Sequence, residues 1–220
     1  MIKNRIEMDK RPAKRVVVVA DGSFPSHYIP LGYLADAEVI VCCDGGAEKA
    51  VQAGYVPNII VGDMDSLSDE MKNRFADRIF EDKEQETNDL TKAVKWCGRS
   101  GYTEITIIGA TGMREDHTIG NISLLAEYVE DFDVKMVTDF GVLIPLKSGR
   151  SFDCAPGQRI SIFSIGEGTV INSVGLKYPL RERVLKNWWE GTLNEAAASS
   201  FTIEFRGGPV IIYLNHQTAG

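Results

Sequence analysis

The residues of this chain that could do chemistry are aspartates and glycines that directly follow apolar runs. Five such clusters occur between residues 21 and 117, and in order they are Asp21-Gly22-Ser23, Asp44-Gly45-Gly46, Gly62-Asp63-Met64-Asp65-Ser66, Asn88-Asp89 and Arg114-Glu115-Asp116-His117. Carboxylates gathered at one place repel one another unless a cation lies between them, and their oxygens suit Mg²⁺ and the phosphates that it bridges. No Walker lysine accompanies these turns. The pattern predicts metal-dependent phosphate chemistry.

The most specific cluster is Gly62-Asp63-Met64-Asp65-Ser66. Its two carboxylates are two residues apart, so an extended backbone with a slight turn brings both to one edge of the fold. The alternative is an aspartate-rich turn in which Ser66 caps the next helix. Asp44-Gly45-Gly46 predicts a strand-to-helix turn with free amides for a phosphate. Asp89 lies in a first helical turn, where the dipole favours a carboxylate whatever its role.

The segment from Gly109 to His117 predicts a second phosphate contact. Gly109 and Gly112 let a ligand approach the backbone. Arg114 offers a forked donor to phosphate, and Asp116 can cap the following helix or help to hold a cation. Three roles stay open for His117, which are a contact at the helix start, an acid–base group and a packed side chain.

The elements that position these clusters follow from the apolar runs before them. Runs rich in β-branched residues predict buried parallel strands at 16–19, 39–43, 58–61, 79–80 and 105–108. Helical spacing predicts helices at 46–53, 67–76, 89–97 and 117–129, with Thr87 or Asn88 as the N-cap of the third. A sixth strand is expected at 133–138. This alternation predicts an α/β layer with a mostly parallel sheet, whose ligand lies beyond the carboxyl ends of the strands.

After Gly141 the pattern changes to short strand-like runs punctuated by glycine, at 142–145, 151–153, 159–165, 169–173, 201–206 and 210–214. Such spacing predicts a small antiparallel β-sandwich. We therefore expect an α/β domain over residues 15–141 and a β-sandwich over 142–220. Residues 1–14 are expected to form a loose tail without a signal peptide. Tyr178, Trp188 and Trp189 are expected in the sandwich core rather than as ligand platforms.

Net charge, cysteine content and hydropathy narrow the classes of partner that this protein is expected to bind. The formal net charge of −7 argues against nonspecific nucleic-acid binding. The four cysteines form no CxxC pair, which predicts reduced thiols in a cytoplasmic protein. No apolar stretch approaches the roughly 20 residues that span a bilayer, so no membrane partner is expected.

Taken in order, the clusters resemble the thiamine pyrophosphokinase family. That family's pattern runs from DGG through GDxDS, a Q-D/E-x-T-D segment entering a K-A helix, and G-G-x-R-x-D-H, to L-x-N. The matching residues here are Asp44 to Gly46, Gly62 to Ser66, Gln85 to Asp89 with Lys92-Ala93, Gly112 to His117, and Asn121. In the second half, Gly175 to Leu180 is similar to G-L-K-W-x-L, and Ser199-Ser200 falls where a Ser-Asn pair is usual. Asn88, Tyr178 and Ser200 stand where the family has threonine, tryptophan and asparagine.

The resemblance implies an Mg²⁺-dependent enzyme that moves pyrophosphate from ATP to thiamine, and a homodimer with the thiamine pocket between subunits. It implies a catalytic set of Asp63, Asp65 and Asp89, and a metal-binding set of these three residues with Asp44. The implied nucleotide contacts are Asp44, Gly45, Gly46, Gly62, Ser66, Lys92, Gly109, Gly112, Arg114, Asp116, His117 and Asn121. The implied thiamine contacts are Gln85, Asn88, Ser199, Ser200 and Phe201. The alternatives are a metal-dependent nucleotide pyrophosphatase or phosphodiesterase, since aspartates and Mg²⁺ serve hydrolysis equally well, and a non-catalytic nucleotide-binding protein.

Overall fold

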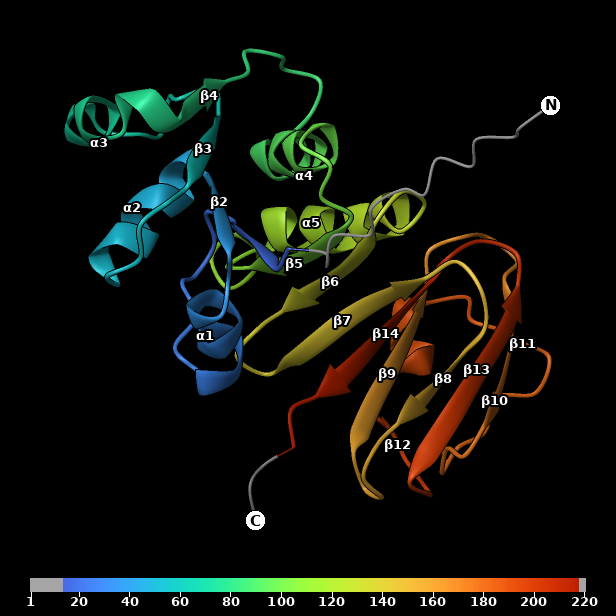
Figure 1. Cartoon of the computed structure of the whole chain (residues 1–220). Coiled ribbons are helices and arrows are strands. Elements are labelled where there is room, and N and C mark those ends of the chain that lie inside the picture. The colour runs from blue at the N-terminus through green and yellow to red at the C-terminus, as the bar shows by residue number, and fades with distance from the viewer. Residues whose placement is uncertain (1–13, 218–220) are drawn as a thin grey trace, which may run out of the picture.

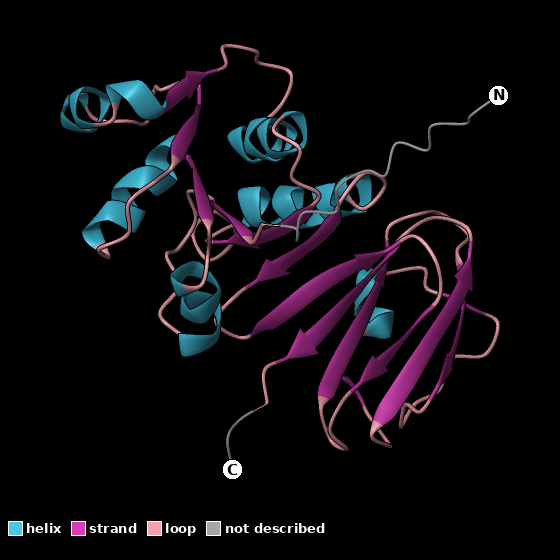
Figure 2. Ribbon diagram, viewed as in Figure 1, coloured by secondary structure: helices cyan, strands magenta, loops and turns pink. Residues whose placement is uncertain are grey.

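The computed structural model describes residues 14–217, so the expected tail lies almost wholly outside the described residues. Figure 1 shows a first half in which helices flank a sheet, and a second half built from long strands. Figure 2 shows the same division, with nearly all helix in the first half. None of the helices in the described part of the chain has the length and apolar character needed to cross a bilayer.

The first half contains six parallel strands in the order β4-β3-β2-β1-β5-β6. All four residues of β1, a strand in the middle of this sheet, are at most 2% exposed. Because successive side chains point to opposite faces, Val16 and Val18 pack into one core and Val17 and Val19 into the other. The strands are β1 (Val16–Val19), β2 (Val39–Cys43), β3 (Ile59–Gly62), β4 (Ile79–Glu81), β5 (Glu104–Ile108) and β6 (Asp133–Val137).

Helices cover both faces of this sheet. α4 (Asp89–Arg99) and α5 (Glu115–Tyr128) contribute to the core beneath one face. The other face is covered by α1 (Tyr28–Ala35), α2 (Asp44–Gln52) and α3 (Asp69–Arg74), followed by the short helix η1 (Ala76–Arg78). The expected α/β alternation is confirmed. The sequence did not predict α1, because its Pro30 and Gly32 have low helix propensity.

The second half extends the same sheet. β7 (Gly141–Leu146) pairs antiparallel with β6, and β14 (Val210–Asn215), β9 (Arg159–Ser164) and β12 (Asn194–Glu195) follow, giving a ten-stranded sheet. A four-stranded sheet of β8 (Arg150–Asp153), β13 (Ser200–Arg206), β10 (Val170–Val174) and β11 (Arg183–Val184) lies against it. The predicted sandwich is present, but one of its sheets continues the parallel sheet. The strand direction changes after β6, close to the boundary expected at Gly141.

Three aromatic residues of the second half differ from expectation. Tyr178, Trp188 and Trp189 are 61%, 39% and 73% exposed, so the interpretation as sandwich core is wrong. Tyr178 lies in the loop after β10, and both tryptophans lie in the short helix η2 (Trp188–Gly191), so no strand face turns them inward. Phe152 and Phe201 fill the core instead, with stacked rings 4.9 Å apart.

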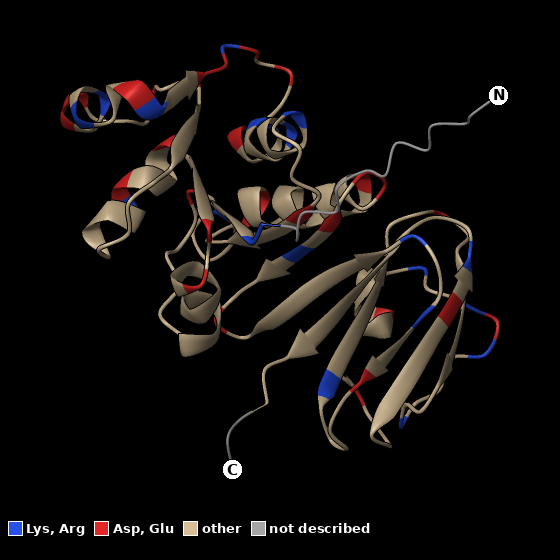
Figure 3. Cartoon of the chain, viewed as in Figure 1, with Lys and Arg blue, Asp and Glu red and all other residues tan. Residues whose placement is uncertain are grey.

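Charged residues lie mainly on the helices and connecting segments of the first half (Figure 3). The strands β7 and β14, which lie side by side in the large sheet, contain no charged residue. In the first half, the acidic clusters lie where strands end and helices begin, at one edge of the sheet.

Candidate metal and phosphate site

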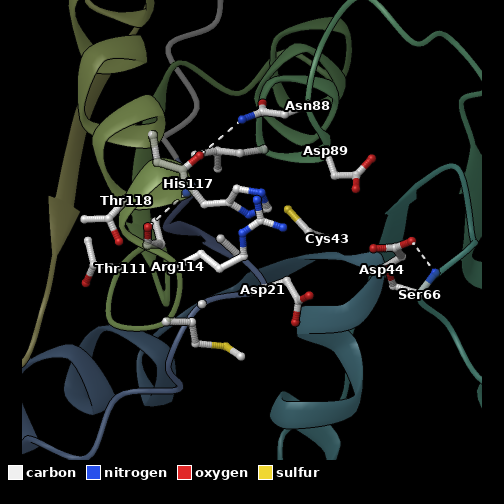
Figure 4. Close-up of a pocket in the computed structure, with 16 residues that line it drawn as sticks. Asp21, Cys43, Asp44, Ser66, Asn88, Asp89, Thr111, Arg114, His117 and Thr118 are labelled. Atoms are coloured by element: carbon white, nitrogen blue, oxygen red, sulfur yellow. Dashed lines mark hydrogen bonds between the residues drawn. The ribbon is translucent and has the colours of Figure 1, made fainter.

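A cavity of about 260 Å³ opens at the carboxyl ends of the central strands (Figure 4). The chain builds β1 to β4 towards one side of β1 and then returns to place β5 on its other side. Such a reversal separates the loops after the two neighbouring strands and leaves a crevice for a ligand. The cavity is lined by residues that follow four strands and by residues that begin α4 and α5, namely Ala20, Asp21, Gly22, Cys43, Asp44, Ser66, Asn88, Asp89, Leu90, Ala110, Thr111, Met113, Arg114, His117, Thr118 and Asn121.

Three of the predicted carboxylates come together. Asp44, Asp63 and Asp65 each offer an oxygen, and these oxygens lie within 4.8 Å of one another. Asp44 is only 2% exposed, and its carboxylate accepts hydrogen bonds from the amides of Gly45 at 2.7 Å and Ser66 at 3.3 Å. Burial raises the pKa of Asp44, although the Gly45 amide opposes that rise. A converging set of hard oxygen donors fits a cation such as Mg²⁺.

The turn between Asp63 and Asp65 makes this convergence possible. Met64 has φ of 68°, a left-handed conformation that non-glycine residues adopt only at a cost. Its side chain is 7% exposed and packs in the core, which holds the backbone in that conformation. The Asp65 amide donates to Asp63 Oδ1 at 3.2 Å. The left-handed conformation of Met64 thus brings the carboxylates of Asp63 and Asp65 close together. In a regular strand they would point to the same face but lie further apart.

Two polar side chains hold the neighbouring carboxylates. Gln85 donates from Nε2 to Asp63 Oδ2 at 3.2 Å, and this bond lowers the pKa of Asp63. Lys92, whose side chain is 3% exposed, donates to Asp89 Oδ1 at 3.1 Å. Burial opposes the charge of Lys92, but its bond to Asp89 and the charges of the nearby carboxylates together outweigh that effect and raise the pKa of Lys92. Lys92 was expected at the nucleotide; it lies outside the cavity lining and holds Asp89, which lines it.

Two asparagines connect the helices that border the cavity. Asn88 caps α4 by accepting from the Thr91 amide at 2.9 Å, which explains why asparagine can replace a threonine there. Its Nδ2 donates to Asn121 Oδ1 at 3.1 Å, and Asn121 donates to the Ala110 backbone oxygen at 2.9 Å. This chain of bonds ties α4 and α5 to the end of β5.

The opposite wall of the cavity is basic. Arg114 and His117 point into the cavity across from Asp44 and Asp89 in Figure 4. Arg114 donates from Nε and Nη2 to the two oxygens of Asp116, at 3.1 and 2.5 Å. This guanidinium, with the His117 amide, lowers the pKa of Asp116 to about 2. Asp116 lies outside the lining, so it orients Arg114 rather than facing the cavity.

The predicted glycines shape the cavity without lining it. Gly45 and Gly46 lie in the first turn of α2, and a Cβ at Gly46 would come within 2.7 Å of the Val19 backbone oxygen. A Cβ at Gly62 would lie 3.1 Å from the Asp44 side chain. Gly109 and Gly112 have positive φ and turn the chain between β5 and α5. Close packing of backbone at this edge therefore depends on them.

The residues expected to contact thiamine are not brought together within one chain. Gln85 lies beside Asp63, whereas Ser199 and Ser200 lie at the start of β13 in the second half (Figure 1). No residue beyond Asn121 lines the described cavity. Phe201 is 1% exposed and stacked on Phe152. Phe201, which the resemblance implied as a thiamine contact, is thus a core residue of this chain, because the period of two turns it into the sandwich.

Sequence reasoning missed the ion pair between Asp21 and Lys49 at the site. Asp21 lines the cavity, and Lys49 of α2 donates to its carboxylate at 2.6 Å. The cluster after β1 marked Asp21 as a residue of interest, but nothing in the sequence pairs it with a lysine 28 positions away.

Family models and known proteins agree on what the chain resembles. Residues 31–138 match the model described as "Thiamin pyrophosphokinase, catalytic domain", and residues 141–213 match "Thiamin pyrophosphokinase, substrate-binding domain". Thiamine pyrophosphokinase 1 of Oryza sativa subsp. japonica is 34% identical over 146 residues, covering 54% of this chain and 54% of that protein. Thiamine pyrophosphokinase of Bacillus subtilis (strain 168) is 32% identical over 124 residues, covering 53% and 56%. The matched region thus spans about half the length of these two relatives.

Solved structures share the whole fold. Thiamine pyrophosphokinase from Bacillus subtilis superimposes with a TM-score of 0.76 at 23% identity, covering 92% of this chain and 99% of that one. Thiamin pyrophosphokinase from Geobacillus thermodenitrificans gives a TM-score of 0.74 at 25% identity, covering 93% and 98%. With two consecutive domain models of one family matched in order along this fold, the chain belongs to the thiamin pyrophosphokinase family.

Proposed function

We propose that this protein transfers pyrophosphate from ATP to the hydroxyethyl group of thiamine, giving thiamine pyrophosphate and AMP. The observation that carries the proposal is that Asp44, the member of the acidic cluster with Asp63 and Asp65 that lines the cavity, lies across it from Arg114 in a chain of this family. A nucleotide polyphosphate carries charge that a cation can neutralise and oxygens to which an arginine can donate. The acidic cluster and Arg114 would supply these two contacts.

The proposed site uses residues of this chain for binding and positioning. Asp44, Asp63 and Asp65, with Asp89 from the start of α4, would hold Mg²⁺, which neutralises charge on the polyphosphate. Arg114 is oriented by Asp116 to donate to phosphate oxygens. The thiamine hydroxyl oxygen attacks the β-phosphorus, the bond from that phosphorus to the oxygen bridging to the α-phosphate breaks, AMP leaves, and the hydroxyl proton passes to a carboxylate or to water. In-line placement of these groups and electrostatic stabilisation of the phosphate charge would supply the rate enhancement.

The thiamine pocket is proposed between two copies of the chain. Gln85 at the acidic cluster and Ser199 with Ser200 in the second half would meet across a homodimer. Exposed apolar side chains in the second half support a partner surface there. Tyr178 and Leu193 are 61% and 79% exposed and lie on adjoining segments, because the Asn194 side chain bonds to both the amide and the carbonyl of Tyr178. We place the protein in the cytoplasm, where its free cysteines would stay reduced.

The decisive experiment is an assay of the protein with ATP and Mg²⁺, with and without thiamine, in which products are identified by mass spectrometry. Formation of AMP and thiamine pyrophosphate only when thiamine is present supports the proposal. Thiamine-independent ATP cleavage would instead assign a nucleotide pyrophosphatase. Nucleotide binding without turnover in either mixture would assign a non-catalytic nucleotide-binding protein.

A further inference from the structure

An ion pair at the edge of the cavity joins α2 to the loop after β1. The Lys49 ammonium nitrogen lies 2.6 Å from Asp21 Oδ1, 2.7 Å from the Asp21 backbone oxygen and 2.9 Å from the Gly22 backbone oxygen. An ammonium group has three donors, so these three oxygens occupy all of them. Lys49 therefore differs from a lysine that reaches out to a phosphate, because its donors are already committed to one loop.

That loop is bonded along its length to the loop after β5. The Gly22 amide donates to the Gly109 oxygen at 2.6 Å, and the Ser23 amide donates to the Thr111 oxygen at 2.8 Å. Ser23 Oγ also donates to the Gly112 oxygen at 2.6 Å. A Cβ at Gly22 would lie 2.5 Å from the Gly109 oxygen, so the two backbones are in direct contact. We call residues 21–23 and 109–114 together the paired loops, and they carry Arg114.

Lys49 is in contact with both members of the paired loops. Besides its bonds to Asp21 and Gly22, its ammonium nitrogen lies 3.4 Å from Met113 Sδ, next to Arg114. Its own helix, α2, begins at Asp44, the buried member of the acidic cluster. One side chain thus links the element that carries the buried aspartate to the loops that carry the arginine.

We propose that Lys49 is a positioning residue of the phosphate site, which fixes the paired loops against α2 and so sets the spacing between the acidic cluster and Arg114. The inference rests on the proposed function in one respect, which is that the ligand of the cavity is a nucleotide polyphosphate. A polyphosphate must meet both sides of the cavity at once. Misplacement of one side by about 1 Å can reduce the rate roughly 100-fold.

The first test compares Lys49→Met, which keeps the length of the side chain but removes its donors, with Lys49→Arg, which keeps the charge. Lys147→Met is the matched control, because Lys147 also donates to a backbone oxygen, that of Glu130, and lies outside the cavity lining. Binding of a non-hydrolysable ATP analogue with Mg²⁺ is measured by calorimetry without thiamine. We expect Lys49→Met to weaken binding about 10- to 100-fold, Lys49→Arg to restore part of the loss, and Lys147→Met to match the wild type.

A double-mutant cycle separates positioning from direct phosphate binding. If Lys49 acts through the paired loops, Asp21→Asn alone weakens nucleotide binding, and Lys49→Met has a much smaller further effect in that background. If Lys49 instead binds phosphate, Asp21→Asn frees its ammonium and tightens binding, and Lys49→Met keeps its full effect. Tighter binding by Asp21→Asn, or wild-type binding by Lys49→Met, overturns the proposal.

The design remains informative if Lys49→Met does not fold, because Asp21→Asn keeps the lysine and gives opposite results under the two models. It also separates this inference from the proposed function. A wild-type protein that binds the ATP analogue but forms no thiamine pyrophosphate contradicts the proposed transfer, while the effects of Lys49 and Asp21 on nucleotide affinity still decide the role of Lys49.

Discussion

Hydrogen bonding and burial shift the pKa values of two neighbouring carboxylates of the acidic cluster in opposite directions. Gln85 lowers the pKa of Asp63, whereas burial raises the pKa of Asp44. A cation placed among the oxygens would favour the ionised form of both groups. A positive ligand would therefore stabilise the charge of Asp44, whose carboxylate has little access to water at 2% exposure.

Replacement of Asp65 by asparagine should remove one oxygen charge from the proposed metal site while the fold survives, because Asp65 is exposed. Even indirect support of a metal ligand is commonly worth about 10- to 100-fold, so we expect at least about a 100-fold loss of pyrophosphate transfer at limiting Mg²⁺. Asp69→Asn is the control, since Asp69 is an exposed residue in the first turn of α3 outside the cluster. Near-wild-type activity of Asp65→Asn at limiting Mg²⁺ would show that Asp65 is not a ligand.

Met64 gives a second prediction at the scale of a single residue. Leucine at this position keeps an apolar side chain without a branch at Cβ, whereas β-branched valine tolerates the left-handed conformation poorly. Met64→Val should lose ~1–2 kcal/mol more stability than Met64→Leu, and it should bind Mg²⁺ more weakly because Asp63 and Asp65 separate. Urea unfolding and calorimetry measure the two effects. Equal stability of the two variants would mean that the turn does not require its positive φ.

At the scale of elements, the loop before α1 is tied to the turn between β6 and β7. Asp139 accepts from Ser26 Oγ at 2.7 Å and from the amides of Ser26 and His27 at 3.0 and 3.1 Å. Near this tie, the His27 and His216 rings stack with centroids 5.1 Å apart, and His216 Nε2 lies 2.8 Å from the Thr138 oxygen. The end of β14 is thereby attached to the first helix, although the two are far apart in the sequence.

Removal of Asp139 should loosen this attachment in a pH-dependent way. Partial burial opposes its charge, but the hydrogen bonds from Ser26 and His27 outweigh that effect and lower the pKa of Asp139. Its contribution is therefore present above the ordinary aspartate pKa of about 3.9 and is lost as pH falls through the lowered value. Asp139→Ala should cost ~1–3 kcal/mol at neutral pH, and the difference from wild type should shrink in acid.

Denaturant unfolding at several pH values measures this difference. Asp36→Ala serves as the control, because Asp36 is an exposed aspartate at the end of α1, beyond the bonds that hold the start of that helix. A pH-independent difference for Asp139→Ala would show that the carboxylate charge does not strengthen the tie.

At the scale of the whole molecule, the continuous ten-stranded sheet joins the acidic cluster and the sandwich in one body. Within that body, Gln85 lies beside Asp63 in the first half, whereas Ser199 directly precedes β13 in the second half. The proposed thiamine pocket therefore takes these two residues from different chains. The exposed Tyr178, Trp189 and Leu193 give the second half an apolar surface of the kind that partners cover.

The shared-site proposal predicts complementation between two inactive variants. Asp65→Asn damages the acidic cluster, and Ser199→Trp blocks the opposite wall of the proposed pocket, so each homodimer should be inactive. A mixed dimer should contain one intact site and regain up to about half of the activity per mixed dimer. Activity is measured after mixing and exchange, with mixed dimers verified by mass spectrometry. Verified mixed dimers without activity, or a monomer by light scattering, would contradict the shared site.

The sequence by itself determined the strands and the clusters that follow them. Runs such as 16–19 and 39–43 are apolar and β-branched, and a buried parallel strand depends on that local composition more than on its partners. The order of strands then places Asp44, Asp63 and Asp65 at one edge of the sheet, since all parallel strands end there. The N-cap of α4 at Asn88 could also be predicted from the local sequence, because an N-cap side chain bonds to the first turn of its own helix.

The tertiary structure alone decided how those parts meet. Met64 is left-handed because the core holds its side chain, although methionine has no local preference for that conformation. Lys49 reaches Asp21 and Gly22 only because α2 packs against the end of β1. One sheet of the sandwich continues the parallel sheet of the first half, and the tryptophans of the sandwich stay outside because they lie in a short helix between strands. Each of these features depends on contacts between segments distant in the sequence, and such contacts leave no local pattern from which they can be predicted.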